Sequence, residues 1–515
     1  MLVAVGRLLQ AANSEGTPGS SRFRRVRGRT WLISGDEPSL WLPIRGPLIW
    51  GRFEADGPPR LVVGGSEERI LREPQEFLRS LARAWPELND LSFERLKSDF
   101  CISLANLLLN RVLAQLAAPG VAPPEPALDG NHNHPFPALR VGPGIEEVAA
   151  CSLLSRTPVR VPLFRVKGRR FTSVHHSERE LLPRWAGRKI EVGGVLPVHP
   201  WQLELSPTVQ AARSLGILDP LDEEVHAFPL ASQRTCRVAA SLYDLKLSID
   251  VTLTGEKRLL FPGNALNAPV VSALARQLLE AEGPGALGLQ CDVATISHED
   301  PEIGTHLAAI VREPLPIPRR GRIVPAVLLW NSPNAAASVL RLDRENIEET
   351  FRSYCRIVMR GPIEFHARWG LSLEPHLQNS MIRVCDGLPV GLVLRDLDGT
   401  ILDSSRVPRM LREARLALPG QHWDEMPSAR DGGRRLLNAM LYGHLGQVTL
   451  RLVLDHQVDS ALLQSCVEQT WKELLTSQRG MVRKRIEQLR EEPLPVKRLL
   501  GNRLQRTGDL IFSAT

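Results

Sequence analysis

Two proline-rich stretches restrict what this chain can fold into more than any other feature of its sequence. They are APGVAPPEPALDG at 118–130 and REPLPIPRRGRIVP at 312–325. Proline fixes φ and has no backbone N–H, so neither stretch can continue a helix or a central strand. At 515 residues the chain is also too long for one small core, and two or three structural units are expected. We therefore predict three successive segments, 1–125, 126–320 and 321–515.

The hydrophobic pattern differs between these segments. We predict that the first is mostly helical, with a buried amphipathic helix over 101–118. In the second, 189–202 and 244–260 alternate apolar and polar residues as half-buried strands do, and 267–283 has helical spacing that ends at a glycine. The third begins with a helix over 345–370, continues as strands, and is again mostly helical towards its end. The whole pattern is typical of an α+β fold.

Composition excludes several classes of protein. Hydrophobic residues make up 43% and charged residues 23%, as in ordinary globular proteins, and no apolar run reaches the length of a membrane span. The apolar N-terminal stretch has no basic region ahead of it, so we expect no secretory signal and a cytoplasmic protein. Seven scattered cysteines without a C-x-x-C pair argue against a disulfide framework and a zinc ribbon.

The charge pattern favours a small anionic ligand at least as well as a nucleic acid. The net charge is +7, but the basic residues are spread among acidic ones. Aromatic residues make up only 5%, and the short basic clusters contain no interleaved aromatics. A platform on which bases stack is therefore not expected, and we predict that the chain binds neither nucleic acid nor membrane.

The stretch EPHLQN at 374–379 places many polar groups beside two apolar runs. The dipeptide Asp386-Gly387 between the following runs is a strong signal for a hairpin turn, and the hairpin would bring Asn379 close to Asp396. Amide and carboxylate oxygens at this spacing are suitable ligands for Mg²⁺, in a layout that resembles kinase-like folds. The alternative is that Asp396 and Asp398 only cap a turn.

A second set of chemical groups lies in the middle segment. The stretch SQRT supplies Ser232, Arg234 and Thr235, and the strand pattern at 244–260 supplies Lys246 and Arg258. Arginine can bind a carboxylate or phosphate with two parallel hydrogen bonds, whereas lysine acts as a point charge. The alternative is that these cations are solvated charges at a strand edge. The histidines of NHNHP at 131–135 have no third ligand in register, so we predict no zinc site there.

In their order along the chain, NHNHP, LPVHPWQ, S-x-RT, LKLSIDVTLTGEKR, GNALNAPVVS, E-x-H-x-QN and RDLDG resemble the IucA/IucC family of NRPS-independent siderophore synthetases. The resemblance covers roughly residues 95 to 505. It implies a cupped architecture with a thumb (1–125), fingers (126–320) and a kinase-like palm (321–515), and it also implies a homodimer. The implied reaction is adenylation of a polycarboxylic acid such as citrate by ATP with Mg²⁺, releasing pyrophosphate. An amine or alcohol then captures the acyl-adenylate as an amide or ester.

The resemblance also assigns roles to individual residues. It places Ser232, Arg234 and Thr235 on the nucleotide, Lys246 on the phosphates, and Arg258 on the carboxylate and α-phosphate. Glu374, His376, Gln378 and Asn379 match the palm motif, and Asp396 matches its metal-linked aspartate. The implied groups are as follows: catalytic, Lys246, Arg258 and His376; ATP-binding, Ser232, Arg234, Thr235, Lys246, Gln378, Asn379 and His134; substrate-binding, Arg258, Glu374 and His376; metal-binding, Asp396 and Asn379.

One motif departs from the family pattern G-H-P-x-H-P-x-x-K, whose first histidine and lysine contact ATP phosphates or substrate. Here Asn131 follows Gly130, and the lysine position is Ala138, while His134 and Arg140 remain. His132 could take the role of the missing histidine through a local shift. The departure keeps open a non-catalytic homologue that binds a polycarboxylate or a partner synthetase. A kinase-like phosphotransferase ranks lowest, because EPHLQN offers no catalytic aspartate.

Overall fold

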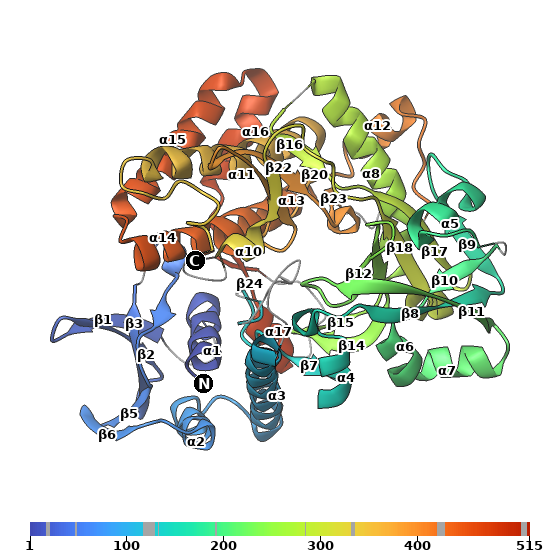
Figure 1. The fold of residues 1–515 in the computed structure, drawn as a ribbon. Helices are drawn as coiled ribbons and strands as arrows, with labels where there is room; N and C mark the ends of the chain where they lie inside the picture. Colours follow the sequence, from blue (N-terminus) through green and yellow to red (C-terminus); the bar gives the residue numbers. More distant parts are fainter. Residues whose placement is uncertain are drawn as a thin grey trace.

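The fold mixes helix and sheet, with 46% of residues helical and 24% in strands, which confirms the mixed character of the predicted fold. The computed structural model describes residues 1–16, 21–46, 49–116, 129–131, 133–190, 193–283, 285–330, 335–419, 428–505 and 512–514. We refer to residues 1–116 as the N-terminal part, 129–312 as the middle part and 322–505 as the C-terminal part. The sheets of the N-terminal and middle parts lie on opposite sides of the molecule, and the helices α11 (Ile347–Trp369) and α13 to α16 (429–491) of the C-terminal part lie across the top (Figure 1).

The N-terminal part contains a six-stranded sheet that the prediction of a mostly helical segment missed. Its strands are short, and buried side chains such as Leu32, Leu40 and Leu61 pack beneath them. Strands of two to seven residues, some of them mostly polar like SRFRRV and SEERI, give little periodic signal in a sequence. The elements are α1 (Leu2–Glu15), β1 (Ser21–Val26), β2 (Arg29–Ser34), β3 (Ser39–Arg45), η1 (Ile49–Gly51), β4 (Glu54–Ala55), β5 (Arg60–Val63), β6 (Ser66–Ile70), α2 (Pro74–Ala84) and α3 (Asp90–Leu116).

The middle part is built on an eight-stranded sheet with the order β10-β8-β11-β12-β13-β18-β17-β9. Large apolar side chains, including Trp185 and Trp201, fill the space between this sheet and its helices. The sheet strands are β8 (Val159–Val166), β9 (Arg169–Thr172), β10 (Val195–Pro197), β11 (Leu218–Pro229), β12 (Thr235–Val238), β13 (Asp244–Leu247), β17 (Asp292–His298) and β18 (Ala308–Arg312).

A smaller three-stranded sheet, β15-β14-β7, and short helices complete the middle part. The remaining strands are β7 (Arg140–Val141), β14 (Ile249–Leu253) and β15 (Glu256–Arg258). The helices are α4 (Ile145–Ala150), η2 (Leu153–Ser155), α5 (Glu178–Ala186), α6 (Pro200–Leu205), α7 (Pro207–Ser214), α8 (Pro262–Glu282) and α9 (Pro301–His306).

The C-terminal part combines a four-stranded sheet, β16-β22-β21-β19, with a group of helices. The strands of this part are β19 (Arg322–Pro325), β20 (Leu371–Ser372), β21 (Ser380–Cys385), β22 (Leu388–Leu394), β23 (Ile401–Leu402) and β24 (Pro495–Lys497). They pair with two strands from outside 322–505, β16 (Leu287–Leu289) and β25 (Phe512–Ala514). The helices are α10 (Ala326–Trp330), α11 (Ile347–Trp369), η3 (Leu397–Gly399), α12 (Val407–Glu413), α13 (Ala429–Leu437), η5 (Asn438–Leu445), α14 (Gly446–His456), α15 (Ser460–Ser477), α16 (Gly480–Glu491) and α17 (Leu499–Gln505).

The predicted hairpin after residue 379 is confirmed. Strands β21 and β22 pair antiparallel, and both turn residues, Asp386 and Gly387, have positive φ, as a tight hairpin turn requires. At the open end, the Arg395 backbone N–H donates to the Asn379 carbonyl at 3.1 Å. The strands predicted to follow the helix over 345–370 begin with only the two residues of β20, because Pro375 cannot donate to a ladder and the chain turns there instead.

Hydrophobic packing crosses the predicted segment boundaries. Helix α8 comes before the boundary at 320, yet its Val270 and Leu274 belong to the same apolar cluster as α11. Strand β16 likewise pairs parallel with β22. At the other end of the chain, Leu500 and Leu504 of α17 pack into the cluster of the N-terminal part, beside α1 and α3 (Figure 1). The three-segment description stays a prediction, and these contacts join the parts around a common centre.

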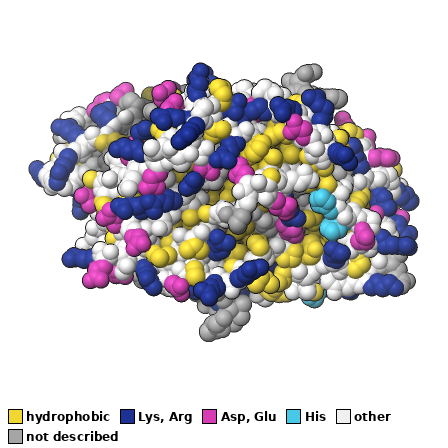
Figure 2. Space-filling model, turned by 90° about the horizontal axis from the view of Figure 1, so that it is seen from above, with side chains coloured by type: hydrophobic (Ala, Val, Ile, Leu, Met, Phe, Trp, Pro, Cys, Tyr) yellow, Lys and Arg dark blue, Asp and Glu magenta, His cyan; other side chains and the backbone are white. Residues whose placement is uncertain are grey.

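The face of the molecule seen from above is not dominated by one sign of charge (Figure 2). In the view from above, Lys and Arg side chains are spread among Asp and Glu, with hydrophobic side chains exposed near the middle (Figure 2). Within the described residues, no helix is long and apolar enough to span a bilayer.

Gly370 provides a test of the packing that ends α11. It has φ of 74°, and a Cβ placed there would lie 2.6 Å from the Cβ of Asp403. Gly370→Ala should therefore lower stability by more than about 1 kcal/mol, since alanine is both strained at this φ and too large. Gly16 ends α1 with φ of 69° and open space around it. The loss of stability in Gly16→Ala therefore measures the backbone strain without a steric clash. Melting temperatures of the two variants should show the larger loss for Gly370→Ala, and equal losses would contradict the tight packing.

Candidate active site

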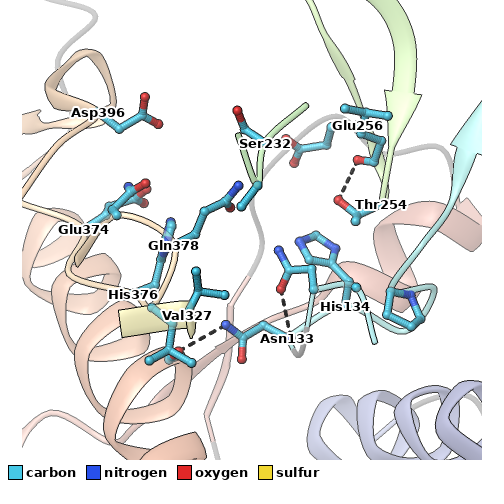
Figure 3. A pocket seen from close by; sticks show the side chains of 18 of the residues that line it. Asn133, His134, Ser232, Thr254, Glu256, Val327, Glu374, His376, Gln378 and Asp396 are labelled. Carbon is cyan, nitrogen blue, oxygen red and sulfur yellow. Dashed lines mark hydrogen bonds between the residues drawn. The ribbon is translucent and has the colours of Figure 1, made fainter. Parts of the chain in front are cut away.

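A cavity of about 400 Å³ lies where the three parts of the chain meet. Eight arginine or lysine side chains and five carboxylates line it, an excess of cations that suits an anionic ligand. Figure 3 shows Glu374 and Asp396 on one wall and Ser232 and Glu256 on the other. All the site residues predicted from the sequence line this cavity: His134, Ser232, Arg234, Thr235, Lys246, Arg258, Glu374, His376, Gln378, Asn379 and Asp396.

Strand register explains how the middle part places its polar and charged side chains in the cavity. Thr235 on β12 lies directly opposite Lys246 on β13, so these side chains share one face of the sheet. Asp244, two residues before Lys246, lies opposite Arg312 on β18. Because alternate residues of a strand face the same side, Arg312 joins Lys246 on the cavity face. Sequence reasoning missed Arg312, whose only signal was a charged residue ending an apolar strand.

Lys246 and Arg312 connect the two walls through ion pairs. The Lys246 ammonium donates to both carboxylate oxygens of Asp398 at 2.6 and 2.8 Å, and it lies 2.9 Å from Oδ1 of Asp396. Arg312 donates to the same Asp396 oxygen at 2.8 Å and to Asp292 Oδ1 at 2.7 Å. The Lys246 and Arg312 side chains are only 3% and 2% exposed. Desolvated cations at these positions require carboxylates close by.

Burial and ion pairing set the protonation of this cluster. Burial alone would raise the pKa of Asp396, but Lys246 and Arg312 outweigh it and hold that pKa well below its usual range. Asp292 is more deeply enclosed, and burial raises its pKa to about 6 although Arg312 opposes the shift. Asp396 is therefore a carboxylate at any physiological pH.

Two further arginines form the cation wall beside this cluster. Arg234 donates to the backbone carbonyl of Arg258 at 3.0 Å, and Arg258 donates to Leu253 O at 3.1 Å and to Thr254 Oγ1 at 2.9 Å. Burial lowers the pKa of Arg234 to about 10, helped by the nearby charge of Arg258. Both guanidiniums remain charged near neutral pH. Two like charges this close favour binding of an anion between them.

The loop that carries Glu374 and His376 is held from below by a chain of buried hydrogen bonds. Trp330 Nε1 donates to the Tyr354 hydroxyl at 2.9 Å, which contacts His444 Nε2 at 2.7 Å. Burial lowers the pKa of His444 to about 3, so the ring is neutral, and its Nδ1–H donates to the Pro375 carbonyl at 2.8 Å. This network fixes the loop from a π-helical segment, η5, that the sequence did not point to.

The two ionisable groups on the loop influence each other. Burial would raise the pKa of Glu374, but Lys497 and His376 overcome this and lower it. The Lys497 ammonium lies 3.5 Å from Glu374 Oε1. Burial lowers the pKa of His376 although Glu374 opposes the shift, so the ring is neutral and can accept a proton. Lys497 and Arg435, which also lines the cavity, were not identified from the sequence.

The motif around NHNHP, which departs from the family pattern, forms the floor of the cavity. Burial lowers the pKa of His134 well below its usual value, and the Arg258 charge adds to this. Asn133 accepts a hydrogen bond from Arg52 and donates to Gly443 O at 3.3 Å, which ties the floor to the N-terminal part and to η5. Ala138 is buried in the lining. The predicted substitute His132 lies outside the described residues.

Arg140 adds a buried cation at the same end of the cavity. It is 7% exposed, and its hydrogen-bond partners include the neutral amides of Gln233 at 2.9 Å and Asn110 at 3.2 Å. Burial lowers its pKa to about 10. Among the described residues no carboxylate lies within 4.0 Å of its guanidinium nitrogens, and burial is the cause of the lowered pKa. The sequence already pointed to Arg140, because this arginine lies just after the altered motif.

The donor set beside the hairpin fits a hard cation. Oδ1 of Asp396 pairs with both Lys246 and Arg312, while Oδ2 accepts no hydrogen bond from a described residue. The Asn379 side chain, which lines the same wall, offers an amide oxygen. Oxygen ligands of this kind are those that Mg²⁺ prefers, with the remaining positions taken by phosphates or water. Among the described residues, no group of three or more His, Cys, Asp or Glu forms a complete metal site.

Comparison with known proteins places these features in a family context. A model of the IucA/IucC family matches residues 124–330, and a model described as a ferric iron reductase FhuF-like transporter matches residues 350–511. The uncharacterized protein y4xN of Sinorhizobium fredii is 26% identical over 74% of this chain and 69% of its own length. A D-ornithine–citrate ligase of Staphylococcus aureus is 20% identical over 80% of this chain and 72% of its own length.

The fold itself matches a solved structure over its whole length. The ATP-bound aerobactin synthetase IucA from a hypervirulent pathotype of Klebsiella pneumoniae aligns with a TM-score of 0.80 at 20% identity. The alignment covers 100% of this chain and 98% of that one. A likeness at this identity concerns the fold.

The Arg312–Asp292 pair can be tested by removing each partner. Arg312→Leu leaves Asp292 charged and buried, which should cost about 3–5 kcal/mol of unfolding free energy. Adding Asp292→Asn should recover part of that loss. Arg312 opposes the raised pKa of Asp292, so its removal moves that pKa above 6. Protonation then removes the lone charge, and the loss in Arg312→Leu should be smaller at pH 5 than at pH 8. Denaturant titrations of the three proteins that show equal stability of the single and double variants would contradict the pairing.

Proposed function

This chain belongs to the IucA/IucC family, and we propose that it is an ATP-dependent siderophore synthetase. It would adenylate one carboxylate of citrate or a related polycarboxylic acid and condense it with an amine or alcohol. The relatives support this substrate class, since they include a D-ornithine–citrate ligase and a spermidine-citrate ligase. The ATP-bound state of the structurally similar aerobactin synthetase supports ATP as the second substrate. Assembly as a homodimer stays a prediction.

The observation that carries the proposal is the meeting of two walls in one cavity. Arg234, Lys246 and Arg258 come from the middle part, and Glu374, His376 and Asp396 come from the C-terminal part. Adenylation must bring a carboxylate and a triphosphate within reacting distance although both are anions. A cavity lined by eight cations offsets that repulsion and the charge that develops at the α-phosphate.

The roles of the residues follow from their positions. Arg258 and Arg234 would hold the attacking carboxylate against the α-phosphate, whose bond to the bridging oxygen breaks as pyrophosphate leaves. Lys246 would bind the phosphates. Asp396 and Asn379 would hold Mg²⁺, which neutralises phosphate charge when bound. His376 is neutral because burial lowers its pKa, so it can accept a proton from the incoming amine.

A non-catalytic homologue is the second candidate, and the altered motif favours it. Asn131 and Ala138 stand where the family pattern has a histidine and a lysine, and both line the cavity. Loss of an imidazole and a cation there would weaken binding of ATP phosphates. The retained cations and the Asp396 cluster favour the enzyme.

Acid-dependent activation can be measured directly. The protein, ATP and Mg²⁺ are incubated with hydroxylamine and one member of a panel of carboxylic acids, and hydroxamate and pyrophosphate are quantified. We expect both products with a tricarboxylic acid such as citrate. Binding of an acid without either product would support the non-catalytic homologue.

Asp396→Asn separates a metal-binding aspartate from a turn residue. The amide keeps the size and can still accept hydrogen bonds, while Arg312–Asp292 and Lys246–Asp398 remain paired. Acid-dependent pyrophosphate release should fall at least about 100-fold with little change in melting temperature. Asp386→Asn changes an aspartate of similar backbone conformation outside the cavity, and it should leave release unchanged. Parental turnover by Asp396→Asn, at several Mg²⁺ concentrations, would refute the assignment.

Substitutions of Arg258 test whether the hydrogen-bond geometry of the side chain matters in addition to its charge. Arg258→Ala should abolish pyrophosphate release, and Arg258→Lys should restore less than about a tenth of it, because a point charge cannot bind a carboxylate through two parallel hydrogen bonds. The exposed strand arginine Arg160 serves as the matched control, with Arg160→Lys expected to behave as the parent. Near-normal turnover by Arg258→Lys would mean that net charge alone suffices.

A further inference from the structure

The five carboxylates of the cavity differ in what surrounds them. Asp396 and Asp398 pair with Lys246, and Asp396 also with Arg312. Glu374 lies 3.5 Å from the Lys497 ammonium. Glu15 accepts a hydrogen bond from the Leu500 backbone at 2.8 Å. Four of the five are therefore already engaged by groups of the protein.

Glu256 is the exception. Its side chain is exposed within the cavity lining, and it forms no hydrogen bond and no ion pair within 4.0 Å with any residue that the structure describes. Its neighbour Lys257 is directed to Asp250 at 2.6 Å instead. Burial lowers the pKa of Arg258, and the nearby charge of Glu256 opposes that shift. A carboxylate in this state is available to a cation from solution.

The strand places this carboxylate beside the predicted point of reaction. Leu253 pairs with Glu256 across the tight turn between β14 and β15. Glu256 and Arg258 are two residues apart on β15, so their side chains project from the same face. Figure 3 shows the Glu256 side chain reaching into the cavity on the side of Ser232, opposite Glu374 and Asp396. A cation bound by Glu256 would therefore lie next to the acid held by Arg258.

We propose that Glu256 is a specificity-determining residue that binds a second, non-reacting ammonium group of the co-substrate. The co-substrate is then an amine with a further positive charge, such as a diamine, rather than an alcohol or a simple monoamine. This inference rests on the proposed synthetase function and names the class of its nucleophile.

The chemistry of amide formation explains why a second positive charge on the amine matters. The lone pair of a neutral amine forms the C–N bond, the bond between the acyl carbon and the AMP oxygen breaks, AMP leaves as an anion, and the nitrogen releases its proton to the neutral His376 ring. The reacting nitrogen is neutral when it attacks, so a lone carboxylate gains little from it. An alcohol carries no charge at all. A distal ammonium, in contrast, stays charged throughout and can pair with Glu256 in a charge-assisted hydrogen bond.

The test compares diamines with monoamines of equal chain length. Amide formation is measured with 1,3-, 1,4- and 1,5-diaminoalkanes and with the corresponding 1-aminoalkanes, using the acid that gives most hydroxamate. The parent should prefer at least one diamine over its monoamine in kcat/KM. Glu256→Gln should lower that ratio about tenfold, mainly through KM for the diamine, and Glu256→Lys should lower it further. Glu280→Gln, an exposed glutamate of α8 outside the cavity, should keep the parental ratio.

The outcomes separate this inference from the function on which it rests. Acid-dependent hydroxamate formation together with an unchanged ratio in Glu256→Gln would overturn the role of Glu256. A parent that prefers monoamines or alcohols would overturn the diamine class. Absence of hydroxamate and pyrophosphate with every acid would reject the synthetase function and this inference with it. Melting temperatures of the variants establish that each is folded.

Discussion

The ion pairs of Lys246 and Arg312 with Asp292, Asp396 and Asp398 determine how the rest of the structure is arranged. Both cations lie on the eight-stranded sheet, and two of the carboxylates follow the hairpin of the C-terminal part. Each side chain is buried or partly buried, so neither wall could keep its charges without the other. The walls are therefore joined by charge at the place where the cavity lies, and hydrophobic contacts through α8 and β16 support the same arrangement.

This arrangement explains why the cavity suits anions although its deepest cations are paired. Lys246 and Arg312 are neutralised, but Arg140, Arg234 and Arg258 are held mainly by neutral amides, hydroxyls and carbonyls. Hydrogen bonds to neutral groups leave most of the charge of these guanidiniums uncompensated, and the buried Nη1 of Arg140 has no hydrogen-bond partner at all among the described residues. Ligands that carry several negative charges complete such a site, and the proposed pair of substrates, a polycarboxylate and ATP, has this property.

The cavity wall contributed by the C-terminal part is held rigid by uncharged groups. The chain of hydrogen bonds from Trp330 through Tyr354 and His444 to the Pro375 carbonyl is fully buried, and it uses the single N–H of a neutral imidazole. A charged histidine at this position would have no acceptor for its second proton, because Tyr354 donates to it. Burial thus fixes both the tautomer and the loop that carries Glu374 and His376. The floor is fixed similarly, by Arg52 against Tyr442 and Asn133.

The sequence by itself determined the mixed fold and the hairpin at 380–394, and its ordered motifs pointed to many of the residues that line the cavity. It could do so because turn residues, strand alternation and ordered motifs are local signals, and Asp386-Gly387 needs only its own backbone preference to form a turn. It missed the N-terminal sheet, whose short strands carry little periodicity. Only the tertiary structure decided that Arg312 joins Lys246, that His444 supports the loop, and that Glu256 lines the cavity without an ion pair to any described residue. These facts depend on strand register and on burial of residues far apart in the chain, and the free energy of a charge is set by the neighbours that folding brings to it.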